Sequence, residues 1–256
     1  MSQDAVTYEV VHNTAWLTMN RPEVLNALSK DMFKELKTAL AKAEAEPSVY
    51  FIGVKGAGRA FSAGLDIREV SSLSSTKQAR EFVYQMVKPF WKQYFQCDKP
   101  VLALVDGPAF GAGAEIALSS DIVVCSNRST FAFSGGRVGA LCCISAAFGH
   151  LTMNGRKVVE MNLTGASVDA EQARSLGLVN YVEDPARLEE RVSKIFSAIR
   201  QVSPVSNASF KRIRRSNITD RLLEVSHKEL LRTITSSEFK AGANAFIKKA
   251  QPNYYQ

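Results

Sequence analysis

The stretch Val101-Leu-Ala-Leu-Val-Asp-Gly-Pro-Ala-Phe-Gly-Ala-Gly-Ala-Glu-Ile-Ala-Leu118 predicts a buried strand, a turn of small residues and a helix, in that order. The first backbone N–H groups of such a helix have no partner inside it and carry positive partial charge, so they suit an anion that develops during a reaction. Glu115, one turn into the helix, is the only ionisable residue between Asp106 and Asp121. Taken alone, the stretch fits either a closely packed helix start or part of a catalytic site.

A second turn of small residues follows another apolar segment. Residues 50–55 predict a buried strand, and Ala60-Phe-Ser-Ala-Gly-Leu-Asp-Ile67 comes a few residues later. One backbone N–H from each turn could point at a single oxygen atom, which is the geometry of an oxyanion hole. The two turns together therefore favour the catalytic interpretation.

Five groups of residues occur along the chain in an order typical of one family. They are Asn20-Arg-Pro22 with Asn26-Ala-Leu28, Phe61-Ser-Ala-Gly-Leu-Asp-Ile67, Gly107-Pro-Ala-Phe-Gly-Ala-Gly-Ala-Glu115, Thr164-Gly165 with Gly177-Leu-Val179, and Ala245-Phe-Ile-Lys-Lys249 with Pro252-Asn-Tyr254. The chain resembles the crotonase (enoyl-CoA hydratase/isomerase) superfamily over nearly its whole length. This resemblance implies an α/β fold, a spiral of ββα units, with a C-terminal helical region that helps to form trimers, often paired into hexamers.

The length and the hydrophobic pattern fit this architecture. We expect residues 1–200 to form the core with the CoA and oxyanion-hole site, and residues 201–256 to form the C-terminal helical region. The pattern predicts a hairpin over 7–19, helices over 29–44 and 76–96, a helix over 169–176 capped by Ser167, and four C-terminal helices between 185 and 249. The aromatic face of the 76–96 helix fits a core or lid face, or a wall for an acyl tail.

The resemblance also implies roles for individual residues. The backbone N–H groups of Ala63 and Ala112 would form the oxyanion hole for the thioester carbonyl oxygen, and Glu115 would be the acid/base. Coenzyme A would enter as part of the substrate, with no permanently bound cofactor and no metal. The residues expected to hold it are Asn26, Ala27, Leu28, Ala63, Asp66, Ile67, Phe246 and Lys249.

The chain departs from the family at one important position. Hydratases of the family use a second glutamate, and spacing places that position at Gly135. Adding water across a conjugated double bond benefits from two acid/base groups, so Gly135 argues against efficient hydration. Isomerisation with Glu115 alone, decarboxylation of a malonyl-type acyl-CoA, and binding of CoA or RNA without turnover all stay open.

Charge and composition limit the partners. The net charge of +7 favours anionic partners such as the phosphates of CoA. The basic run Lys211-Arg-Ile-Arg-Arg215 lacks the interleaved aromatic residues of an RNA-binding module, so a nucleic-acid partner is not expected. The four cysteines show neither metal nor disulfide spacing, and no apolar run would span a bilayer. Because neither end carries a targeting signal, we expect a cytoplasmic enzyme, in fatty acid metabolism by resemblance.

Overall fold

The computed structural model describes residues 4–254, so the ends from which we predicted the lack of targeting signals lie partly outside the described residues. Its main sheet has six strands in the order β1-β2-β3-β4-β6-β9. The bounds are β1 Val6–Val11, β2 Thr14–Met19, β3 Phe51–Gly56, β4 Val101–Val105, β6 Ile122–Ser126 and β9 Tyr181–Glu183. β1 and β2 form the predicted antiparallel hairpin, and all the other neighbours are parallel, as the alternation of strands and helices indicated.

A second, three-stranded sheet was not foreseen in full. It pairs β5 Pro108–Phe110 with β7 Thr130–Ala132, and β7 with β8 Ser167–Asp169. Residues 108–110 were expected to be only a turn, and Ser167 was expected to cap a helix. Asp169 makes that cap instead, in a capping box with Gln172. The short sheet matters because β5 leads directly into the helix that carries Glu115.

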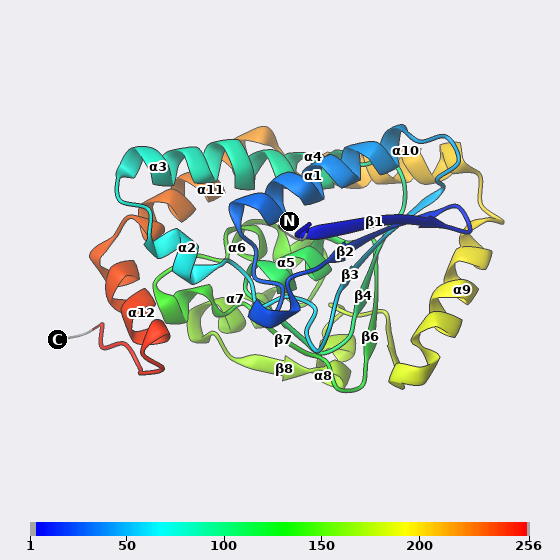
Figure 1. Cartoon of the computed structure of the whole chain (residues 1–256). Helices are drawn as coiled ribbons and strands as arrows, with labels where there is room; N and C mark the ends of the chain where they lie inside the picture. Colours follow the sequence, from blue (N-terminus) through cyan, green and yellow to red (C-terminus); the bar gives the residue numbers. More distant parts are fainter. Residues whose placement is uncertain (1–3, 255–256) are drawn as a thin grey trace.

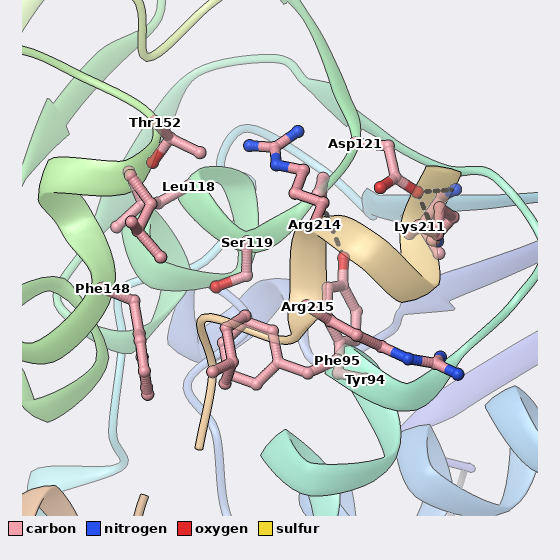
Figure 2. A pocket seen from close by; sticks show the side chains of 14 residues that line it. Tyr94, Phe95, Leu118, Ser119, Asp121, Phe148, Thr152, Lys211, Arg214 and Arg215 are labelled. Atoms are coloured by element: carbon pink, nitrogen blue, oxygen red, sulfur yellow. Dashed lines mark hydrogen bonds and ion pairs between the residues drawn. The ribbon is translucent and has the colours of Figure 1, made fainter. Parts of the chain in front are cut away.

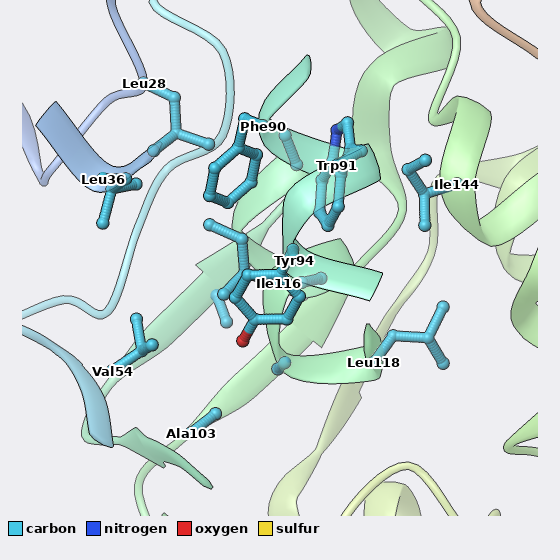
Figure 3. Packing of buried hydrophobic residues seen from close by; sticks show 14 of the residues in the cluster. Leu28, Leu36, Val54, Phe90, Trp91, Tyr94, Ala103, Ile116, Leu118 and Ile144 are labelled. Carbon is cyan, nitrogen blue, oxygen red and sulfur yellow. The ribbon is translucent and has the colours of Figure 1, made fainter. Parts of the chain in front are cut away.

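Helices cover both faces of the main sheet (Figure 1). Side chains alternate along the strands, so Phe51, Leu102 and Val124 face one side and pack against the helix α9, whereas their neighbours face the main core. The remaining helices except α10 pack around the main core and the small sheet (Figures 1 and 3). The helix bounds are α1 Lys30–Ala45, α2 Ile67–Ser71, α5 Ala112–Ser119, α6 Cys143–Phe148, α7 Gly155–Thr164, α8 Ala170–Ser175, α9 Leu188–Ile199, α10 Pro204–Arg215, α11 Asp220–Ile234 and α12 Ser237–Ile247, with short 3₁₀ turns η1 Pro22–Val24, η3 Ser134–Val138, η4 Gly149–Leu151 and η5 Pro185–Arg187.

The helix predicted over 76–96 forms, but it has three parts. α3 Thr76–Glu81 and α4 Lys88–Gln96 are joined by η2 Phe82–Val87, which is π-helical. The wider turn is continuous with both helices, so the hydrophobic pattern alone does not reveal it. π-helical turns are frequent at functional sites, and this one ends at Val87, a residue of the cavity described below.

The C-terminal helices contribute to the body of the molecule as well as to its surface. α11 packs against α6, and α12 packs against η3. α12 also packs against α2 (Figure 1). α10, in contrast, contains no buried residue. A division of the chain at residue 200 stays a prediction.

Candidate active site

The two small-residue turns predicted from the sequence pack directly against each other. Ser62 pairs with Ala109 of β5, and the Phe110 N–H donates to the Ser62 carbonyl oxygen at 2.8 Å. A Cβ atom added to Gly113 would lie 2.6 Å from that same oxygen. One added to Gly64, whose φ is +90°, would lie 2.7 Å from the Phe110 oxygen and 3.2 Å from the Ala112 nitrogen. Side-chain bulk is missing here because the two backbones touch.

A cavity of about 610 Å³ opens beside these turns, within the usual range for a site that binds a small molecule or cofactor. Exposed cations and Phe246 lie at its rim, and buried apolar side chains form its interior. The predicted site residues that line it are Ala27, Ala63, Asp66, Ile67, Ala112, Glu115, Phe246 and Lys249. One cavity therefore unites residues from both turns and from the C-terminal helix.

Glu115 is buried, with 3% of its surface exposed, yet it lines this cavity. Its Oε1 accepts hydrogen bonds from the backbone N–H groups of Ile144 and Ser145, both at 2.9 Å. Among residues 4–254 no hydrogen bond is found for Oε2. Burial raises the pKa of Glu115 to about 7, although the two backbone donors and the Ser145 hydroxyl act to lower it. A carboxyl group with such a pKa can accept and return a proton near neutral pH.

Another part of the cavity wall contains Gly135 and Cys142. The Gly135 N–H donates to Cys142 Sγ at 3.3 Å, and a Cβ at Gly135 would lie 3.0 Å from that sulfur and from the Ala140 oxygen. Burial raises the pKa of the Cys142 thiol well above its usual range, so it is an inert packing group, as expected from the sequence. This wall offers no carboxylate.

The prediction for the first oxyanion donor was wrong. The Ala63 N–H already donates to the Leu25 carbonyl oxygen at 2.9 Å, and a single N–H cannot serve a ligand at the same time. Ala112, the other predicted donor, is the first residue of α5, where the helix supplies no acceptor. No hydrogen bond is found for its N–H among residues 4–254.

Leu65, which was not predicted from the sequence, carries another unbonded N–H on these turns and lines the cavity together with Ala112. Leu28 donates to the Gly64 oxygen at 2.7 Å and accepts from the Asp66 N–H at 3.1 Å. Because these two groups face Leu28, the N–H of Leu65 between them faces away from it. Within the described chain it has no hydrogen bond, and Leu65 lines the cavity. The sequence held no signal that separates Ala63 from Leu65, since any residue but proline has an N–H.

Two of the residues expected to hold CoA have a different role. Asn26 and Leu28 are fully buried outside the cavity lining, and their N–H groups are bonded to the Arg21 and Gly64 oxygens. The Asn26 side chain donates to the Ala57 and Ala60 oxygens at 2.9 Å, so it fastens the segments beneath the first turn. Asn26 and Leu28 therefore position the site without facing a ligand.

Asp66 has a structural role in addition to its place on the cavity. Its Oδ2 forms an ion pair with Arg21 Nη1 at 3.0 Å, and its Oδ1 caps α2 by accepting from the Glu69 N–H at 3.3 Å. Among residues 4–254, the unengaged charges at the rim are one anion, Glu23, and three cations. The cations are Arg59, Arg68 and Lys249, all exposed and without an ion pair in the described chain.

The basic run on α10 lies elsewhere, beside a small cavity of about 60 Å³ (Figure 2). Lys211 pairs with Asp121, and both Arg212 and Arg215 pair with Asp98. Most of its charge is thus engaged inside the molecule. A further cavity, of about 610 Å³, lies between the 44–51 segment and the start of α10. Neither cavity contains a predicted site residue.

Residues 9–256 match the model of the enoyl-CoA hydratase/isomerase family. The chain belongs to this family. It is 30% identical over 255 residues to the mitochondrial enoyl-CoA hydratase of Pongo abelii, covering 95% of this chain and 84% of that protein. It is 32% identical over 212 residues to the short-chain-enoyl-CoA hydratase of Clostridium acetobutylicum, covering 80% and 79% of the two chains.

Solved structures of the family give the same fold. The enoyl-CoA hydratase/isomerase of Pseudoalteromonas atlantica matches with a TM-score of 0.85 at 25% identity, covering 98% of this chain and 99% of that one. The carnitinyl-CoA hydratase of Mycobacterium avium also gives 0.85, at 26% identity and 99% coverage of both. The predicted crotonase-like α/β fold is confirmed, as is the prediction of an enzyme of the enoyl-CoA hydratase/isomerase family. Within residues 4–254, no helix has the length and apolar character to cross a bilayer, and no group of three or more His, Cys, Asp or Glu is placed to hold a metal.

Proposed function

We propose that this enzyme binds an acyl-CoA thioester and stabilises its enolate, with Glu115 as the single acid/base. The observation that carries the proposal is that the free N–H groups of Ala112 and Leu65 and the unpaired Oε2 of Glu115 belong to residues that line one cavity. Two amides directed at a thioester oxygen would stabilise the negative charge that appears when a proton leaves the adjacent carbon. Leu65 takes the place in this proposal that Ala63 had in the sequence-based prediction.

Double-bond isomerisation is the reaction of this class that one carboxylate supports best. Glu115 would remove a proton from the carbon next to the thioester carbonyl, leaving an enolate whose electrons extend over the double bond. It would then return the proton to the far carbon. With a pKa near 7, the same group can act as base and then as acid. Hydration would need a further group to activate water, and the Gly135 wall has none.

The rim of the cavity supports a CoA ester as the ligand. Arg59, Arg68 and Lys249 are unpaired cations that could approach the diphosphate and the 3′-phosphate, while Phe246 and Ile67 offer apolar surface to the rest of the carrier. CoA is thus part of the substrate. The alternative of an RNA-binding protein is weakened because the α10 cations are ion-paired within the chain.

A panel of three thioesters tests this function. Purified protein is incubated with a 3-enoyl-CoA, crotonyl-CoA and methylmalonyl-CoA, and binding of CoA is measured alongside. Faster isomerisation of the 3-enoyl ester than hydration of crotonyl-CoA would support the proposal. Rapid hydration would show that one carboxylate suffices, preferential loss of CO₂ would indicate a decarboxylase, and CoA binding without turnover would indicate a binding protein.

We also propose that the chain assembles as a homotrimer or a dimer of trimers. α10 exposes Val205, Phe210 and Ile213, at 76%, 62% and 73%, although a soluble surface normally keeps few such side chains together. Association would cover them. Sedimentation equilibrium checks the mass, and a monomer at micromolar concentration would contradict this assembly.

A further inference from the structure

The buried side chains that line the cavity beyond Glu115 are mostly apolar, and the half-buried Ser134 also belongs to the lining. Val87, Cys142, Cys143 and Leu230 are buried and form its walls. Trp91 of α4 joins them, one helical turn after the π-helical segment ends. Unlike the other four, Trp91 carries a strong hydrogen-bond donor, the indole N–H.

The Trp91 ring is fixed by its neighbours. Its centroid lies 5.0 Å from that of Phe90 and 6.0 Å from those of Tyr94 and Phe95, in edge-on and stacked arrangements. Figure 3 shows the indole nitrogen on the edge of the ring that faces away from Ile116 and Leu118. With 1% of its surface exposed, the side chain has little freedom to turn that nitrogen elsewhere.

The indole N–H of Trp91 has no acceptor within the protein. Among residues 4–254 no hydrogen bond is found for Nε1, whereas the Tyr94 hydroxyl in the same cluster bonds Ser120 Oγ at 2.7 Å. Two side-chain atoms within residues 4–254 are fully enclosed and lack a hydrogen-bond partner. They are Tyr8 Oη and His227 Nε2. Trp91 Nε1 is not one of these enclosed atoms, so a small part of its surface is accessible. Because Trp91 lines the cavity, the accessible surface of this nitrogen faces the cavity. A buried indole N–H normally has a hydrogen-bond partner, and here that partner would be an atom of a bound ligand.

We propose that Trp91 is a specificity-determining residue whose indole N–H binds an oxygen on the acyl chain, beyond the thioester carbonyl. This inference rests on the proposed function, because the acyl chain is what would fill the interior. Sites built to bond a substrate hydroxyl or carbonyl discriminate against the analogue that lacks it, because the donor is then left unpaired. The favoured substrates are acyl-CoA esters with such an oxygen on the acyl chain.

The charges around the cavity favour a neutral oxygen, a hydroxyl or a ketone. The cations of the lining, Arg59, Arg68 and Lys249, are all exposed at the rim. A carboxylate at Trp91 would therefore be buried without a counter-charge, in the same cavity as the Glu115 carboxyl. A neutral oxygen needs only one donor, which the Trp91 indole N–H supplies.

Binding of saturated thioesters tests this inference separately from turnover. Calorimetry compares hexanoyl-CoA with 5-hydroxyhexanoyl-CoA, 5-oxohexanoyl-CoA and the dicarboxylic adipoyl-CoA, on the wild type and on Trp91→Phe, which keeps an aromatic ring but removes the N–H. We expect the hydroxy or oxo ester to bind the wild type about 10–100-fold tighter than hexanoyl-CoA, and this ratio to fall towards one in Trp91→Phe. Equal binding of the esters by the wild type, an unchanged ratio in the variant, or tightest binding of adipoyl-CoA would overturn it. If no thioester binds at all, the proposed function fails as well.

A spectroscopic measurement on the wild type guards against misfolding of the variant. The chain has two tryptophans, so ¹⁵N labelling gives two indole N–H signals, with Trp16 as the internal reference. The oxygenated esters should shift the Trp91 signal downfield relative to hexanoyl-CoA and leave the Trp16 signal in place. A Trp91 signal that is the same with oxygenated and plain esters would contradict the hydrogen bond.

Discussion

Two parts of the cavity lining, one with Glu115 and the other with Gly135 and Cys142, differ in what they can do chemically. On one wall, Glu115 is held by two backbone N–H groups and keeps one oxygen unpaired. On the other, Gly135 and Cys142 fill the corresponding space with a backbone amide and an inert thiol. Proton transfer is therefore available from one side only. This asymmetry, more than the fold shared with the family, is what should decide the reaction.

Removing the acid/base from the active wall should have the largest effect. Glu115→Gln keeps an oxygen that can accept from Ile144 and Ser145 but cannot take up a proton. Turnover of the best thioester should fall about 10²–10⁴-fold. Stopped-flow kinetics measures this, with CoA-ester binding as the test that the site survives. A folded variant that retains most of its rate would mean that Glu115 is a structural carboxyl group.

Removing the amide at the start of α5 should have the next largest effect. Ala112 is the first helical residue, a position that accepts proline, so Ala112→Pro deletes the N–H while preserving the helix. We expect kcat to fall about 10²–10³-fold. Ala112→Gly, which keeps the N–H, should lose far less. Similar losses in the two variants would indicate that packing against Gly64, and not the amide, is what matters.

Burial of Glu115 should also affect stability in a pH-dependent way. Its pKa is raised from 4.5 to about 7, so the folded protein binds this proton more tightly than the unfolded chain does. The resulting stabilisation is complete below about pH 4.5 and is lost as the pH rises through 7, at a cost of at most about 3 kcal/mol. In urea unfolding, the free energy of unfolding of Glu115→Gln should therefore rise relative to that of the wild type between pH 5 and pH 8.

A surface carboxyl group provides the control for this pH effect. Glu160 is half exposed and pairs with Lys157, so Glu160→Gln should change the free energy of unfolding by at most about 1 kcal/mol. The same titration should appear in kinetics, because proton abstraction needs the ionised form, and kcat/KM should rise with pH to a plateau above 7. An unfolding difference between wild type and Glu115→Gln that does not vary with pH would show that Glu115 titrates normally.

The sequence predicted the active wall better than the rest of the site, for physical reasons. Ala112 and Glu115 could be predicted because the sequence shows where the helix begins, and the first N–H groups of every helix lack a partner inside it. Ala63 was mistaken for a donor because its bond to the Leu25 oxygen depends on a loop far away in the chain. Trp91 was overlooked within a recognised aromatic face, since a periodic pattern does not tell which side chain lacks a partner. Long-range hydrogen bonding, rather than local pattern, separates these cases.

Converting the inactive wall into a second active wall is the most direct test of the asymmetry, and its expected effect is the smallest. A glutamate at position 135 would place its Cβ 3.0 Å from both Cys142 Sγ and the Ala140 oxygen. Gly135→Glu is therefore combined with Cys142→Ala, which removes the sulfur and leaves room for the backbone to shift. Hydration of crotonyl-CoA should rise about tenfold over the wild type, below the full 10²–10⁴ of a well-positioned acid/base. Gly135→Gln with Cys142→Ala has the same shape but no acid/base group, so it should show no gain. If the two double variants hydrate crotonyl-CoA at equal rates, the missing carboxylate does not limit hydration. The difference between the two walls would then not decide which reaction the enzyme catalyses.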